Sequence, residues 1–110
     1  MSGPERMRVE GCRVVAGFDD GRAPDIDDDA DLELQGGTLL LTYWDDGGAV
    51  VFAGERQDDG RYELVARSRP RRAVLRREGA ARLVGEWEGK GDRGSLTVDV
   101  PRPIDDGATT

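Results

Sequence analysis

A chain of 110 residues, 36% hydrophobic and 35% charged, predicts one small folded domain and excludes both a long disordered chain and a multidomain protein. No stretch reaches the roughly 18 apolar residues of a membrane-spanning helix, and residues 1–5 lack the features of a secretory signal, so we expect a cytoplasmic protein without membrane contact. The formal net charge of −7 disfavours binding to nucleic acid.

The first predicted strand covers residues 6–18. Val9 and Val14 have opposite parity along this stretch, so a bulge near Gly11 is needed to place both on one face of a sheet. Cys12 is the only cysteine, which rules out an internal disulfide, and a β segment favours its role as a small buried hydrophobic residue.

Residues 19–31 are predicted to form an acidic loop. They hold seven aspartates against one arginine, show no hydrophobic period, and include Gly21 and Pro24. An EF-hand beginning at Asp25 would have acids at its first, third and fifth positions, but Ala30 replaces the required glycine and Gly36 the required glutamate. We therefore predict no metal or other cofactor.

A short strand with Leu32 and Leu34 is expected after this loop, followed by two hairpins. Asp46-Gly47 fits a two-residue type I′ turn, which predicts three cross-strand pairs: Tyr43 with Val50, Leu41 with Phe52, and Leu39 with Gly54. A three-residue loop that ends at Gly60 predicts two more: Gly54 with Leu64, and Phe52 with Ala66.

The second half of the chain continues the pattern after a break at residues 68–72, which contain Pro70. We expect Leu83 to face Leu75 and a last turn at Gly91-Asp92, with three pairs that follow from it: Trp87 with Leu96, Gly85 with Val98, and Leu83 with Val100. Residues 71–82 are the one segment rich enough in helix formers to suggest a helix instead. Residues 101–110 are predicted to be a frayed tail beyond a single β domain over 1–100.

Eight short strands with regularly spaced turn signals predict an all-β fold, an antiparallel meander that forms a barrel or a two-sheet sandwich. The stretch from Leu83 to Glu88, followed by a glycine turn and Leu96-Thr97-Val98, resembles the terminal hairpin of lipocalin-like barrels. That resemblance covers a small part of the chain, and no residue role is carried over from it.

The expected interior includes Tyr43, Phe52, Leu64, Leu83 and Trp87. Apolar residues also occupy the opposite parity, where a solvated sheet face should be polar; they are Leu40, Trp44, Ala49, Val51, Val65 and Val84. The N-terminal strand or a second protein chain could cover this second face.

Residues 67–77 hold six arginines and no acid. Guanidinium groups bind phosphates well, but this segment has no aromatic residue on which a nucleic-acid base could stack. We expect the arginines to meet acids instead, either those of the 25–31 loop or those of a partner.

We do not expect an enzyme. The chain has no histidine to serve as a general base, and Glu86 and Glu88 have the spacing of any two acids on one strand face.

The sequence favours a non-catalytic protein-interaction module, capable of self-association, with opposed acidic and basic regions that orient a partner. The residues expected to bind a partner are Leu40, Trp44, Val51, Arg69, Arg71 and Arg72. The alternative is a small-ligand-binding barrel of calycin type, with a pocket lined by Tyr43, Tyr62 and Trp87.

Overall fold

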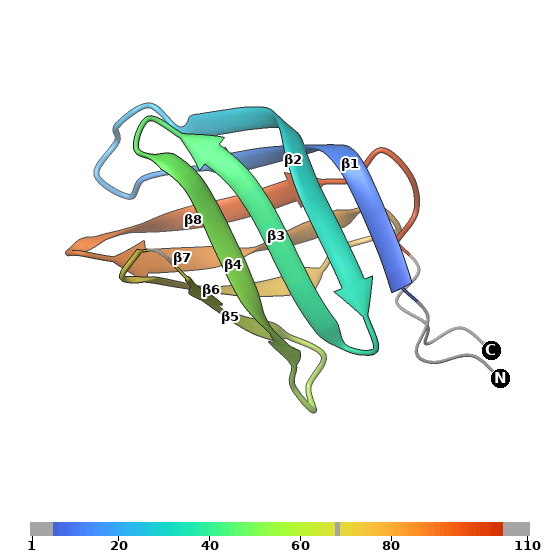
Figure 1. The fold of residues 1–110 in the computed structure, drawn as a ribbon. Coiled ribbons are helices and arrows are strands. Elements are labelled where there is room, and N and C mark those ends of the chain that lie inside the picture. The colour runs from blue at the N-terminus through green and yellow to red at the C-terminus, as the bar shows by residue number, and fades with distance from the viewer. Residues whose placement is uncertain (1–5, 68, 105–110) are drawn as a thin grey trace, which may run out of the picture.

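The computed structural model describes residues 6–67 and 69–104. It contains eight antiparallel strands, which are β1 (Arg6–Ala16), β2 (Asp25–Gln35), β3 (Thr38–Asp45), β4 (Gly48–Arg56), β5 (Tyr62–Ala66), β6 (Arg71–Arg77), β7 (Arg82–Gly89) and β8 (Asp92–Asp99). Each strand pairs with the next, and β8 pairs with β1, so the sheet closes into a barrel (Figure 1). The all-β prediction is confirmed, and the β1–β8 pairing decides for a barrel over a sandwich.

Alternate residues of the strands fill the barrel with apolar side chains, as expected for a barrel of eight strands. Tyr43, Phe52, Leu64, Leu83 and Trp87 are all buried in this common interior, as predicted. The helix considered for residues 71–82 is wrong, because that segment consists of β6, a turn and the start of β7.

The bulge predicted in the first strand is present. Gly11 has a φ of 76°, and the pairing with β2 shifts register on either side of Cys12. This extra residue changes the parity of the strand, so that Val9 and Val14 both point inward.

The loop predicted for residues 19–31 is too long, because β2 already begins at Asp25. The second half of β1 needs backbone partners, and Asp25 to Ala30 supply them, with Ala16 facing Asp25 and Cys12 facing Ala30. Aspartates disfavour strands but are tolerated here because most of their side chains lie at the surface; Asp28, for example, contacts Arg13 at 3.3 Å.

The two central hairpins have the predicted register, including Leu41 opposite Phe52 and Gly54 opposite Leu64. Gly60 has a φ of 89°, as its loop requires. The turn type predicted at Asp46-Gly47 is wrong, because the positive φ of this turn falls on Gly48. Asp45 stabilises the turn by accepting the backbone N–H of Gly47 at 2.8 Å.

The two C-terminal hairpins are displaced by two residues from the predicted register. Leu75 faces Gly85 across the β6–β7 hairpin. Trp87 faces Gly94 because the last turn is Lys90-Gly91, where both φ angles are positive. A shift of two residues keeps every side chain on its own face, so Leu83 and Trp87 still point inward.

The first part of the tail is ordered, contrary to prediction. Ile104 is buried, and its N–H donates to the carbonyl of Ala80 at 2.7 Å. Its own carbonyl accepts a hydrogen bond from Arg77 at 2.6 Å. These contacts attach residues 101–104 to the β6–β7 connection, while residues 105–110 lie outside the described part of the chain.

Candidate functional site

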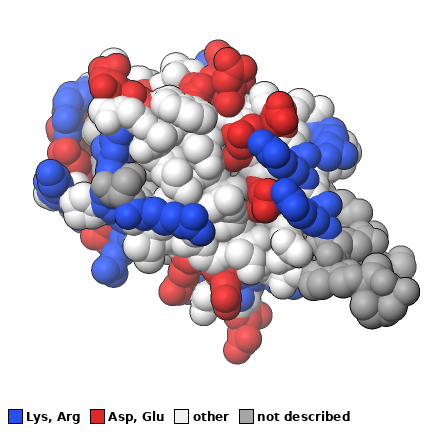
Figure 2. Space-filling view, in the orientation of Figure 1, with Lys and Arg blue, Asp and Glu red and all other residues white. Residues whose placement is uncertain are grey.

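A continuous apolar area lies on the outside of the barrel over β3, β4 and β5. We call it the outer patch; it consists of Leu40, Trp44, Ala49, Val51, Ala53 and Val65. The strand register places Leu40, Ala53 and Val65 side by side. Trp44 is 50% exposed and Val65 is 62% exposed. Figure 2 shows this face as uncharged surface with charged side chains around it.

The prediction that the N-terminal strand covers this face is wrong, because β1 is part of the barrel wall between β2 and β8. Five of the six residues assigned to a second apolar face belong to the outer patch. Val84 does not, because it lies on β7, beyond β6. Ala53 was missed, although the predicted pairing of Leu39 with Gly54 already puts Ala53 opposite Leu40.

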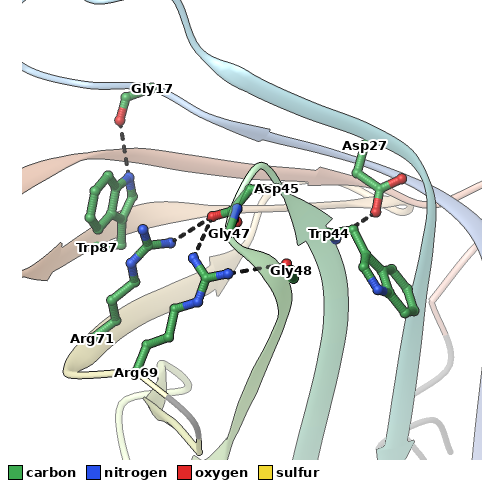
Figure 3. A network of polar contacts seen from close by, with 9 residues as sticks. All are labelled: Gly17, Asp27, Trp44, Asp45, Gly47, Gly48, Arg69, Arg71 and Trp87. Atoms are coloured by element: carbon green, nitrogen blue, oxygen red, sulfur yellow. Dashed lines mark hydrogen bonds and ion pairs between the residues drawn. The ribbon is translucent and has the colours of Figure 1, made fainter.

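Trp44 is held by its backbone while its side chain points away from the barrel (Figure 3). Its N–H donates to a carboxylate oxygen of Asp27 at 2.8 Å. The other oxygen of Asp27 accepts the N–H of Asp29 at 2.8 Å. Asp27 therefore fixes the end of β3 against β2 and sets the position of the exposed indole.

Charged residues of opposite sign flank the outer patch. On β2, Asp31 lies opposite Thr42 and Glu33 lies opposite Leu40, so these two acids flank the patch on the β2 side. Asp31 lies 3.6 Å from Arg8, and Glu33 lies 3.1 Å from Arg6.

On the opposite side of the patch the flank is basic. Arg72 lies opposite Val65, and the N–H of Arg67 donates to the carbonyl of Val51 at 2.9 Å. Neither arginine forms an ion pair with any other described residue. A shallow cavity of about 190 Å³ lies where Arg67 approaches Leu40 and Ala53.

Arg69 and Arg71, both predicted to bind a partner, instead bind an acid of their own chain. They lie 2.7 Å and 3.3 Å from the same carboxylate oxygen of Asp45, and Arg69 also donates to the carbonyl of Gly48 at 3.1 Å (Figure 3). The acid in direct contact with both arginines is Asp45 at the β3–β4 turn, whereas Asp25 of the 25–31 segment interacts with them only through its charge. Their position favours a structural role, and we leave them out of the outer patch.

Arg71, which contacts Asp45, also contacts the buried ring of Trp87. The guanidinium carbon of Arg71 lies 4.9 Å from the centroid of the Trp87 ring, and the Trp87 indole N–H donates to the carbonyl of Gly17 at 3.0 Å (Figure 3). Burial alone would raise the pKa of Asp45, but hydrogen bonds from Arg69 and Gly47 and the charges of both arginines outweigh it and lower that pKa. The carboxylate is thus ionised and holds the two arginines and the turn together, which favours a structural role over proton transfer.

Tyr43, Tyr62 and Trp87, the predicted ligand pocket, are packed into the core. The ring of Tyr43 stacks on Phe52 with centroids 6.3 Å apart, and burial raises the Tyr43 pKa to about 12. Trp87 also borders a surface cavity of about 240 Å³, but neither tyrosine lines it. This packing favours a structural role for the three rings, and ligand binding stays a prediction.

Other sites considered from sequence gain no further support. Glu86 and Glu88 are exposed on β7. Within residues 6–67 and 69–104, no group of three Cys, Asp or Glu side chains is placed to hold a metal ion. The same part of the chain has no helix long and apolar enough to cross a membrane. Comparison with protein-family models, curated proteins and solved structures finds no match to this chain.

Proposed function

We propose that this protein acts by binding another protein surface through the outer patch, without catalysis. The observation that carries the proposal is the exposure of Trp44 and Val65 within one apolar area surrounded by charge. Large apolar side chains in a contiguous patch with a polar rim are typical of protein interfaces, and tryptophan is the residue most enriched at their energetic centres.

The closed barrel limits how a partner can bind. Each described strand pairs with a neighbour on both sides over at least part of its length, so the described residues leave no strand with a whole edge open to an added strand. Binding through side chains on the barrel surface is therefore favoured. The backbone of Trp44 is already fixed by Asp27, which reduces the entropy lost when the indole is buried against a partner.

The charged flanks support orientation of the partner. Arg67 and Arg72 on one side and Asp31 and Glu33 on the other give the patch a direction across the strands. Such an arrangement selects one mode of docking and accelerates encounter more than it adds affinity.

A photo-crosslinking residue at position 65 tests the proposal in living cells. We expect a crosslinked protein product that is lost when Trp44→Ala is added. The matched control carries the same residue at Thr97, on the outer face of β8, away from the patch, and should give no such product. Equal crosslinking at positions 65 and 97, or none at position 65, would contradict the proposal.

A further inference from the structure

We infer that the partner bound by the outer patch is a second copy of this chain. The two copies pack face to face about a two-fold axis that lies in the interface and runs along the strands, between β3 and β4. This inference rests on the proposed function and names its partner.

The charge order across the strands supports this symmetry. One row of outward residues, in register from β2 to the end of β5, reads Asp31, Thr42, Val51, Arg67. Rotation about the axis places β2 of one copy over β5 of the other, and β3 over β4. The acid at one end of the row then faces the arginine at the other end, in both directions, so each dimer has two Asp31–Arg67 contacts.

The neighbouring row has the same polarity. It runs from Glu33 on β2 through Leu40, Ala53 and Val65 to Arg72 on β6. Two adjacent rows that both begin with an acid and end with an arginine give the whole patch an acidic and a basic flank. The two-fold rotation superposes Asp31 on Arg67, whereas in the second row it places Glu33 over Val65, with Arg72 one strand further out.

Side-chain sizes also match about this axis. Each residue of β3 comes to lie over the position that its own β4 neighbour occupies in the other copy. Trp44 therefore meets Ala49, and Leu40 meets Ala53, so large residues face small ones. Only a residue that lies on the axis itself would meet its own counterpart in the other copy.

The surroundings of Arg67 also favour a second copy as the partner. This arginine has no ion-pair partner among the described residues, and it borders the shallow cavity that Leu40, Ala53 and Glu33 also line. In the dimer, Asp31 of the second copy provides a carboxylate for Arg67. Within its own chain Asp31 lies 3.6 Å from Arg8, and its side chain is exposed enough to contact Arg67 of the other copy as well.

Charge reversal tests the pairing directly. In sedimentation velocity of the purified protein we expect a concentration-dependent dimer, weakened about tenfold or more by either Arg67→Glu or Asp31→Arg, because each change creates two like-charge contacts per dimer. An equimolar mixture of the two variants should restore dimerisation, since the mixed dimer again has two opposite-charge contacts. Arg76→Glu, on the outer face of β6 opposite Val84, is the matched control and should dimerise like the original chain.

Thermal unfolding of each variant separates loss of association from loss of folding. The inference is overturned if the original protein is monomeric at concentrations near 1 mM, if both charge reversals dimerise like the Arg76→Glu control, or if the mixture fails to restore the dimer. A monomeric pure protein that still gives the Trp44-dependent crosslink to a different chain in cells would overturn the second-copy partner alone and leave the proposed function standing.

Discussion

The carboxylate of Asp45, only 4% exposed, lies 2.7 Å from the guanidinium of Arg69, which comes from the connection between β5 and β6. This contact links two loops at the same end of the barrel, and Arg71 reaches the same oxygen from the start of β6. One buried acid thus neutralises two arginines that the sequence alone suggested for a partner.

Replacing Asp45 by Asn should lower the free energy of unfolding by about 2–3 kcal/mol at pH 7. The change leaves two partly buried guanidinium groups without their counter-charge, and the remaining exposure of the arginines reduces the cost below that of a fully buried pair. Urea unfolding measures the effect. The exposed neighbour Asp46→Asn is the control and should change stability by less than about 0.5 kcal/mol.

The effect of Asp45 should depend on pH in a defined direction. Its pKa is lowered in the folded protein, so it contributes stability that is fully present above the unfolded value of 3.8 and is lost as pH falls through the lower folded value. The difference between the original chain and Asp45→Asn should therefore shrink in urea titrations below pH 4. A difference that stays constant down to pH 2 would contradict this account.

Lys90→Asn should stabilise the protein by about 0.5–1 kcal/mol. Lys90 has a φ of 52° beside Gly91 at 81°, a conformation that asparagine adopts more readily than lysine. Lys90→Gln removes the same charge without this tolerance and should give no comparable gain. Equal stabilisation by both variants in urea unfolding would show that charge, and not backbone conformation, is responsible.

Gly54→Ala should destabilise the barrel by about 3 kcal/mol or more. A β-carbon at this position would lie 1.8 Å from the carbonyl oxygen of Glu63 on the neighbouring strand, so the backbone must move. Gly37→Ala offers a comparison, because that glycine has a φ of 97° but open space around it. Its cost should be limited to the backbone strain of about 1–2 kcal/mol. Equal losses in thermal unfolding would contradict the predicted clash.

Cys12 should react with a thiol reagent only when the protein unfolds. Burial, with a further contribution from the charge of Asp31, raises its pKa to about 11, so thiolate is scarce at pH 8. We expect modification about a hundredfold or more slower in the native protein than in urea. Fast native modification would show that β1 opens locally at its bulge.

Ile104→Ala should lower the free energy of unfolding by about 2 kcal/mol or more, because Ile104 is only 5% exposed and belongs to the core. The exposed neighbour Pro103 provides the control, and Pro103→Ala should have little effect. Thermal unfolding distinguishes a docked segment from a frayed one, for which both substitutions would be neutral.

Local patterns were sufficient for the fold class and for the interior. Parity required a bulge at Gly11, and glycine-rich turns gave the register of the two central hairpins; both are observed. The last two hairpins are displaced by two residues from the predicted register because the β6–β7 connection spans residues 78–81 and the last turn falls on Lys90-Gly91 instead of Gly91-Asp92. The face assignments survived, since side chains alternate with a period of two.

The outer patch was also largely visible in the sequence, as apolar residues of the wrong parity for a buried face. Arg67 was not singled out, because the absence of an ion-pair partner for it among residues 6–67 and 69–104 depends on its tertiary surroundings. The acid that Arg69 and Arg71 contact could not be predicted either, since Asp45 lies more than twenty residues away along the chain.

The alternation of apolar and polar residues and the position of the glycines determined that this chain forms an antiparallel meander with Trp87 and Phe52 inside, because a strand's two faces follow from its residue order. Only the tertiary structure decided that β8 closes on β1, that the aspartates from 25 onward join β2, and that β1 lies in the wall instead of over Trp44. Those outcomes depend on backbone hydrogen bonds between segments that are far apart in sequence. The N–H and C=O groups of each strand need partners, and the closed barrel determines which strand provides them.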